Sequence, residues 1–271
     1  MPLSLTILTL FILLGALAGF LAGLLGIGGG IILVPLFLWA LPLAGFAPEV
    51  MVHSALGTSL AIILPTAVSS TWGHRRRGNV NWHQVYRLAS GVLLGTLFGA
   101  MAAARLPGVW LQALFGVMQI LVGLKLFFRP RHLPPEETAA SSFGPLFLVG
   151  ALTGGFSAFF GVGGGVIAVP LMILFLKLPT PMAVGNSSAL IAIASLAGAA
   201  SYAWHGLGVA GLPPYSIGYV NLLVAVLVAP SAILLAPLGV RVASRLGDDK
   251  ILRLFSILLI LIGAQMAFKA F

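Results

Sequence analysis

The sequence predicts an all-α, polytopic membrane protein made of two inverted-topology repeats of about five helical segments each, with short, broken helices at glycine-rich motifs. Of its 271 residues, 60% are hydrophobic and 7% are charged, whereas a soluble domain carries about 25% charged residues. No charged residue precedes Glu49, and none lies between Leu178 and Val240. Uncharged apolar runs of this length are typical of membrane-spanning helices.

A glycine-rich motif occurs once in each half of the chain. Residues 26–30 read Gly-Ile-Gly-Gly-Gly and lead through four apolar residues to Pro35. Residues 161–165 read Gly-Val-Gly-Gly-Gly and lead in the same way to Pro170, 135 residues after Pro35. Glycine in a helix interior is about 1 kcal/mol less favourable than alanine. Each cluster therefore predicts a break between two helices, and we call residues 26–30 the first break and residues 161–165 the second break.

The apolar runs predict ten helical segments. We expect them at 5–25, 30–41, 50–72, 85–104, 109–128, 143–160, 165–177, 181–204, 216–244 and 249–269. At 1.5 Å per residue, the second and seventh segments are too short to cross a hydrocarbon core of roughly 30 Å. We expect each of these two segments to complete a crossing together with the unwound glycines that precede it.

Matched positions extend the repeat beyond the glycine motifs. Gly57-Thr58-Ser59 pairs with Gly185-Asn186-Ser187 at a spacing of 128 residues, and Gly99 and Gly123 pair with Gly239 and Gly263 at a spacing of 140. The order of the motifs is kept, so the pattern predicts an internal duplication. The first transmembrane repeat is expected at 1–131, a polar linker at 132–142 and the second repeat at 143–271.

An odd number of segments per repeat places the two halves in opposite orientations. If the loop between the third and fourth segments is cytoplasmic, the lysines and arginines divide 12 to 2 in favour of the cytoplasm, which is the bias of the positive-inside rule. The net charge of +9 therefore indicates topology rather than nucleic-acid binding. Both termini are expected outside the cytoplasm. The twelve are Arg75, Arg76, Arg77, Arg87, Lys125, Arg129, Arg131, Lys177, Arg241, Arg245, Lys250 and Arg253; the other two are Arg105 and Lys269.

The two breaks predict a binding site for an anion. Inverted repeats with broken helices are a signature of secondary transporters, and the breaks mark the binding site. The glycines lead into helices, whose N–H groups and positive dipole ends bind anions without a charged side chain. The alternative is tight packing, since small residues are common at helix interfaces in membranes. The predicted substrate-binding residues are Gly28, Gly29, Gly30, Thr58, Ser59, Gly163, Gly164, Gly165, Asn186 and Ser187.

No catalytic residue, metal site or cofactor is expected. The chain has no cysteine, which removes thiolate metal sites and thiol chemistry. The spans offer no nucleophile, metal cluster or acid–base pair, so an enzyme is not expected. His53, His74 and His205 lie near segment ends, where we expect wetted interfacial histidines and a proton relay is the alternative.

The two motifs Gly26–Pro35 and Gly161–Pro170 resemble the TauE/SafE sulfite exporter family, and so do Gly57-Thr58-Ser59-Leu60 and the basic loop His74–Gly78. The resemblance covers nearly the whole chain. It implies a carrier of the inner (plasma) membrane for sulfite or for an organosulfonate such as sulfoacetate. The residues alone indicate a small anion at a neutral site lined by backbone.

The expected function is secondary transport of such an anion, in the direction of export, by alternating access around a site at the membrane midplane. An anion channel, or a carrier for another small anion, is the alternative. The expected partners are the anion and the lipid bilayer, with no nucleic acid. A homo-oligomer, the coupling ion and the direction of transport stay open.

Overall fold

The structure is a computed structural model that describes residues 5–25, 29–128, 142–243 and 248–269. Within these residues the chain forms ten helices and one short hairpin. The first half contains α1 (Leu5–Leu25), α2 (Gly30–Leu43), α3 (Pro48–Arg76), α4 (Trp82–Arg105) and α5 (Gly108–Phe127). The second half contains α6 (Phe143–Phe160), α7 (Gly165–Leu176), α8 (Thr180–His205), β1 (Ser216–Ile217), β2 (Val220–Asn221), α9 (Leu222–Ala243) and α10 (Asp248–Lys269).

The ten predicted helices are confirmed, with small differences at their ends. α3 continues to Arg76, so that two residues of the basic run lie in its last turn. The helix expected to begin at residue 216 begins at Leu222, because the antiparallel strands β1 and β2 occupy the preceding residues. Gly218, between these strands, has φ 53°, a left-handed conformation that glycine adopts without steric penalty.

Seven helices are long and apolar enough to cross a membrane: α1, α3, α4, α5, α6, α8 and most of α9. α2, α7 and residues 255–269 of α10 are shorter apolar helices. The chain is therefore a multi-pass, all-α membrane protein. The two shortest helices are those that follow the glycine breaks, as the sequence predicts.

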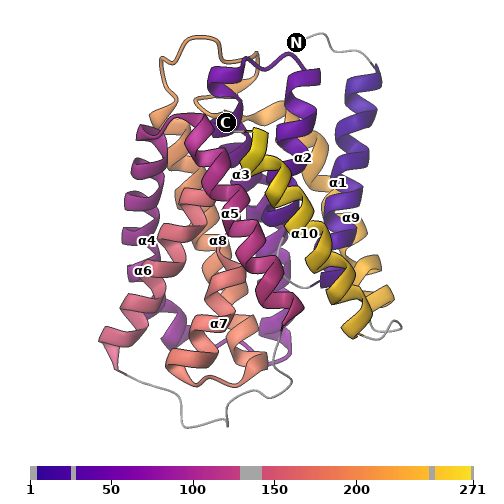
Figure 1. Ribbon diagram of the computed structural model, residues 1–271. Helices are drawn as coiled ribbons and strands as arrows, with labels where there is room; N and C mark the ends of the chain where they lie inside the picture. Colours follow the sequence, from indigo (N-terminus) through magenta and orange to yellow (C-terminus); the bar gives the residue numbers. More distant parts are fainter. Residues whose placement is uncertain (1–4, 26–28, 129–141, 244–247, 270–271) are drawn as a thin grey trace.

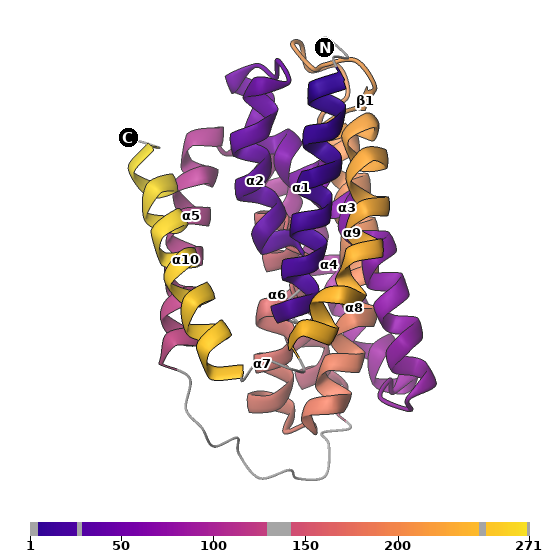
Figure 2. The same cartoon turned by 90° about the vertical axis from the view of Figure 1, so that its right-hand side faces the viewer.

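The two short helices lie toward opposite ends of the bundle. α2 occupies the upper half in Figure 1 and α7 the lower half, and the side view in Figure 2 agrees. The chain enters α1 and leaves α10 at the upper end, whereas α5 ends and α6 begins at the lower end. This is the arrangement that inverted repeats predict, and the direction of a symmetry axis relative to a membrane stays a prediction.

Equivalent contacts join α1 to α9 and α6 to α4. A Cβ at Gly15 would lie 2.4 Å from the carbonyl oxygen of Val228, and a Cβ at Gly150 would lie 2.1 Å from that of Leu88. These residues are related by the spacings of 135 and 140 found in the sequence. Glycine permits backbones to approach this closely. The same relation holds between the contact of Gly19 with Ala232 and that of Gly154 with Val92, and between the contact of Gly239 with Phe20 and that of Gly99 with Gly155.

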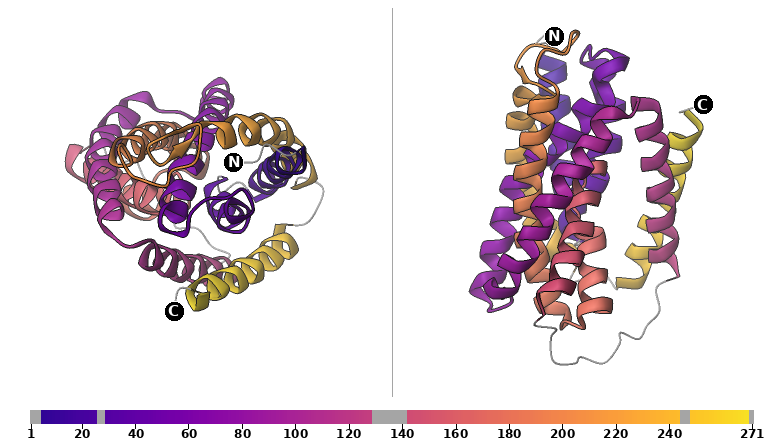
Figure 3. Two further views of the ribbon diagram at one scale, coloured as in Figure 1. Left: turned by 90° about the horizontal axis from the view of Figure 1, so that it is seen from above. Right: turned by 90° about the vertical axis from the view of Figure 1, so that its left-hand side faces the viewer.

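Two contacts between α5 and α10 are also related to each other by the repeat spacing. A Cβ at Gly123 would lie 2.8 Å from the carbonyl oxygen of Ser256, and a Cβ at Gly263 would lie 2.6 Å from that of Gly116. Each contact maps onto the other at a spacing of 140 residues. This pair lies at one edge of the bundle, as the view from above shows (Figure 3). The two halves are thus packed against each other through matched glycine contacts.

The described basic residues gather at one end of the bundle, which we call the basic end. It is the lower end in Figure 1, where α3, α5, α7 and α9 finish and α4, α6, α8 and α10 begin. The basic residues at these helix ends are Arg75, Arg76, Arg77, Arg87, Lys125, Lys177, Arg241 and Arg253, whereas Arg105 and Lys269 end α4 and α10 at the opposite end. Arg129, Arg131 and Arg245, and the side chain of Lys250, lie outside the described residues.

Candidate functional site

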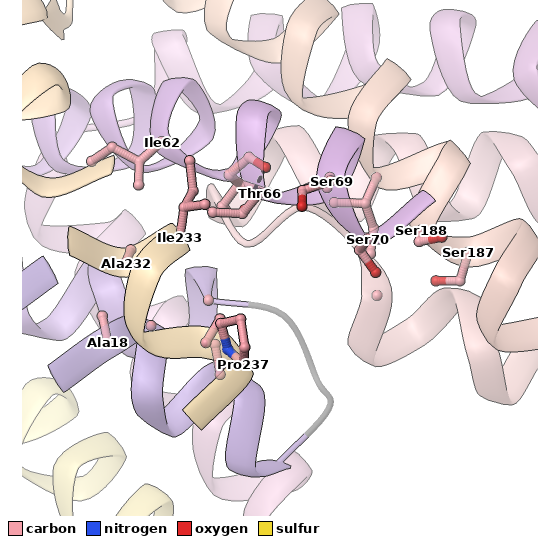
Figure 4. Close-up of a pocket in the computed structure, with 18 of the residues that line it drawn as sticks. Ala18, Ile62, Thr66, Ser69, Ser70, Ser187, Ser188, Ala232, Ile233 and Pro237 are labelled. Carbon is pink, nitrogen blue, oxygen red and sulfur yellow. Dashed lines mark hydrogen bonds between the residues drawn. The ribbon is translucent and has the colours of Figure 1, made fainter. Parts of the chain in front are cut away.

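A cavity of about 590 Å³ lies where the two glycine breaks meet. Six helices contribute to its wall, from both halves of the chain (Figure 4). Most of the wall is apolar. The polar or ionisable side chains that line it are Thr66, Ser69, Ser70 and His74 from α3, Ser187 and Ser188 from α8, and Arg241 from α9.

The N-termini of both short helices face this cavity. Gly29, the N-cap of α2, and Gly165, the first residue of α7, both line it. The first N–H groups of a helix have no intrahelical acceptor, and the helix dipole makes this end positive. The breaks also touch each other, because a Cβ at Gly30 would lie 2.4 Å from the Cα of Val162. Two positive helix ends thus converge on one cavity.

Hydroxyl groups complete the polar part of the wall. The Ser187 side chain is 1% exposed, and its Oγ has no hydrogen-bond partner among the described residues. Ser188 Oγ donates to the carbonyl oxygen of Gly185 at 2.7 Å, and Thr66 Oγ1 donates to that of Ile63 at 2.7 Å. The hydroxyl groups of Ser188 and Thr66 can still accept hydrogen bonds, but each already donates its hydrogen to a backbone carbonyl oxygen. Ser187 therefore offers the free donor in the buried part of the cavity.

The cavity extends to the basic end and is closed at the other end. Ser69 and Ser70 are exposed, and His74 and Arg241 lie in the last turns of α3 and α9. In Figure 4, Ser69 and Ser70 of α3 lie beside Ser187 and Ser188 of α8. Toward the other end, fully buried side chains such as Leu60 and Tyr202 fill the space between α3 and α8. As far as the described residues show, the cavity is thus open toward the basic end and closed toward the other.

Thr58 and Asn186 do not line the cavity; they hold helix ends in place. Thr58 Oγ1 accepts from the backbone N–H of Asn221 at 3.0 Å, and Asn186 Oδ1 accepts from that of Asn81 at 2.8 Å. These two bonds are related by the repeat spacings of 128 and 140. The difference between Thr58 and Asn186 in sequence therefore leaves the matched bond intact. Asn81 in turn caps α4 by accepting from Gln84 N–H at 3.2 Å.

The remaining predicted site residues support the breaks. Ser59 Oγ donates to the carbonyl oxygen of Gly161. Gly163 and Gly164 have φ values of 76° and 81°, where other residues are strained. A Cβ at Gly163 would lie 2.9 Å from Ile191 Cγ2. Gly28 lies outside the described residues. Of the ten predicted residues, Gly29, Gly165 and Ser187 line the cavity.

Two features differ from the sequence-based expectation. His53, expected at a wetted interface, is 5% exposed, and its Nε2 is 3.1 Å from the carbonyl oxygen of Ala103. Its ring stacks on Tyr219, with 4.9 Å between ring centroids. The hydroxyls of Thr66, Ser69 and Ser70 were missed. Their spacing of three to four residues, beyond Ser59 on the same helix, was the available signal.

The comparisons with known proteins identify the family. Residues 11–266 match the family described as sulfite exporter TauE/SafE. The chain belongs to this family. The family consists of membrane transporters and not of enzymes, so the chain is a membrane transporter.

Three relatives extend this similarity along the chain, and each is named a probable membrane transporter protein. One from Haemophilus influenzae is 29% identical and covers 97% of this chain and 99% of its own length. One from Xylella fastidiosa is 30% identical over 94% of this chain and 93% of its own. One from Methanocaldococcus jannaschii is 27% identical over 97% of this chain and 96% of its own length. The similarity to these relatives thus extends over more than nine tenths of this chain and of each relative.

Proposed function

We propose that this TauE/SafE family member exports a small sulfur-containing anion, sulfite or an organosulfonate such as sulfoacetate, through the cavity between the two breaks. The observation that carries the proposal is the convergence of two helix N-termini, at Gly29 and Gly165, on one cavity that also holds the unpartnered Ser187 hydroxyl. The family description supports the sulfur-containing substrate.

The chemistry of the cavity favours a small anion. Moving an isolated ion into an apolar medium loses solvation worth tens of kcal/mol in a Born estimate, so the site must replace water with donors. Among the described residues that line the cavity, none is acidic, and Arg241 at the basic end carries the fixed positive charge. The helix N-termini and Ser187 supply neutral donors farther in. An anion is thereby attracted at the opening and held without a permanent charge that would trap it.

Transport proceeds by alternating access in this proposal. The cavity opens to the basic end, which the positive-inside rule assigns to the cytoplasm. The structure then corresponds to a state that takes up substrate from the cytoplasm. Export of an anion from a negative-inside cell is favourable by about 2.3 kcal/mol per charge per 100 mV, so the membrane potential alone can drive it.

Transport by purified protein in liposomes tests the substrate. We expect flux of sulfite or sulfoacetate above that of sulfate, thiosulfate and chloride in the same panel, and faster flux when the potential favours anion movement. If chloride or sulfate moves as fast as sulfite and sulfoacetate, the substrate assignment is wrong. An anion channel is the competing function, and single-channel currents in a planar bilayer would favour it over a carrier.

The location in the inner membrane, with both termini outside the cytoplasm, is part of the proposal. It is supported by the basic end, which carries eight described lysines and arginines and lies opposite the start of α1 and the end of α10. A reporter fused after Phe271 that is active only outside the cytoplasm should be active. Activity of a cytoplasm-specific reporter at that position would reverse the orientation.

A further inference from the structure

The residues of α8 from Thr180 to Trp204 have counterparts in α3, 128 positions earlier. By this relation Tyr202 corresponds to His74, and the two lie at opposite ends of the bundle: His74 in the last turn of α3 and Tyr202 near the end of α8. Tyr202 lies at the closed end and His74 at the open end. The matched contacts of Thr58 and Asn186 indicate that the relation holds in space as well as in sequence.

Tyr202 seals its end of the bundle. Its side chain is 0% exposed, and its hydroxyl donates to the carbonyl oxygen of Ala158 at 3.0 Å. Ala158 lies in the last turn of α6, where carbonyl groups lack intrahelical partners. Gly57 of α3 lets the tyrosine approach, because a Cβ there would lie 2.9 Å from Tyr202 Cβ. One side chain thus links α3, α6 and α8.

The surroundings of His74 match those of Tyr202, but no hydrogen bond like that of Tyr202 joins His74 to a described residue. It lines the cavity, and its Nδ1 is buried without a hydrogen-bond partner among the described residues. The counterpart of Ala158, 135 positions earlier, is Gly23 in the last turn of α1. The adjacent Ala22 lines the same cavity as His74. The acceptor that would complete the match therefore lies on α1, another helix of the cavity wall.

We propose that His74 is the gate residue of the basic end and that His74 and Tyr202 close opposite ends in alternate states. In the alternate state an imidazole N–H of His74 donates to the carbonyl oxygen of Gly23, and Gly185 receives the ring as Gly57 receives that of Tyr202. Tyr202 then releases Ala158, and the other end opens. This inference rests on the alternating access of the proposed function.

Single cysteines report which end is open, because the chain has none of its own. Ser70→Cys reports the basic end, where Ser70 is exposed in the cavity. Ser195→Cys reports the other end, because Ser195 is 0% exposed and its counterpart, Ala67, lines the cavity. His83→Cys, on the exposed surface near the start of α4, is the control. A membrane-impermeant maleimide is added to each side of proteoliposomes of known orientation.

The effect of each gate variant is measured at the cysteine at the opposite end of the bundle. The substituted side chain therefore cannot itself block the maleimide from that cysteine. Tyr202→Phe removes one hydrogen bond from the observed state and should slow labelling of Ser70→Cys. His74→Tyr installs the side chain that closes the other end and should speed labelling of Ser195→Cys. We expect changes of about two- to tenfold, the range for one neutral hydrogen bond. Labelling of His83→Cys should stay unchanged in both.

The outcomes separate the gate from alternating access itself. Sulfite or sulfoacetate added to the reporters without gate variants tests alternation alone. If the anion changes the labelling of both reporters but neither gate variant does, the assignment of His74 and Tyr202 is wrong while alternation stands. If neither the anion nor any variant changes either reporter, alternating access fails. His74→Ala provides a second check: it should leave Ser70→Cys as reactive as before, or more so, and slow transport.

Discussion

Gly30 and Val162 are in direct contact, although they belong to different halves of the chain. A Cβ on Gly30 would lie 2.4 Å from the Cα of Val162 and 2.7 Å from its carbonyl carbon. Gly30 begins α2, and Val162 precedes α7 within the second break. The two helix N-termini are held together by this contact, and the cavity borders both of them.

Gly30→Ala should therefore destabilise the protein. The added methyl group meets backbone, which yields less easily than the end of a side chain, and overpacking of this kind is destabilising by about 1–3 kcal/mol. We expect a lower melting temperature of the purified protein in detergent and a lower abundance in membranes. Gly29→Ala is the matched control, because its Cβ would lie 3.6 Å from Leu33 Cδ1, an ordinary contact. Equal stability of the two variants would contradict the contact.

Ser187→Ala should weaken substrate binding and leave stability nearly unchanged. The Ser187 hydroxyl has no partner among the described residues, so its removal breaks no described bond within the protein. Loss of one neutral hydrogen bond to the anion is worth about 0.5–1.5 kcal/mol, or roughly a two- to tenfold higher concentration for half-maximal transport. Ser59→Ala should behave differently, because Ser59 Oγ donates to the Gly161 carbonyl oxygen. The Ser59→Ala variant should have a lower melting temperature. If Ser187→Ala transports as the unmodified protein does, Ser187 is not part of the binding site.

Thr58→Ala and Asn186→Ala should each destabilise the fold. Each leaves a backbone N–H, of Asn221 or of Asn81, without its side-chain acceptor, and an unsatisfied buried donor is unfavourable by about 1–3 kcal/mol. Asn186→Ala should be the more severe, since Asn186 Nδ2 also donates to Gln84 Oε1 at 2.9 Å. Thermal unfolding with a fluorescent reporter measures both. Unchanged melting temperatures would show that these bonds carry no net stabilisation.

The sequence was sufficient to predict the helices and the breaks because both depend on local chemistry. Uncharged apolar runs predict spans, and glycine clusters predict their interruption. The contacts between halves, such as Gly15 with Val228 and Gly150 with Leu88, were not predicted, although the spacings found in the sequence relate one contact to the other. The hairpin before α9 was missed, because its two-residue strands are too short to produce an alternating pattern.

The sequence was less informative about which side chains face the cavity. Thr58, Ser59 and Ser187 are polar residues in two matched motifs, and their types alone indicate donors near the breaks. Only Ser187 lines the cavity, because the cavity opens toward one end and so exposes the two halves unequally. In the sequence, matched residues of the two halves look equivalent, so the repeat does not show which of them faces the cavity in one state.

Transport by Gly29→Val tests the central claim most directly, with Gly29→Ala as its control. Gly29 has φ −73°, so other residues fit its backbone, and its Cβ would lie between Leu33 and Ala22, which line the cavity. A valine there should fill the space beside the α2 N-terminus. Gly164→Val is a poorer test, since φ is 81° and a Cβ would lie 3.0 Å from the Thr153 carbonyl oxygen.

The measurement is the initial rate of sulfite and sulfoacetate flux in proteoliposomes that contain equal amounts of each protein. If an anion passes through this cavity between the two helix N-termini, Gly29→Ala should transport nearly as the unmodified protein does. Gly29→Val should lose at least about 90% of the flux, a tenfold loss that corresponds to a barrier raised by about 1.4 kcal/mol. Normal flux by Gly29→Val at equal abundance would contradict the account, because the anion would then take another route.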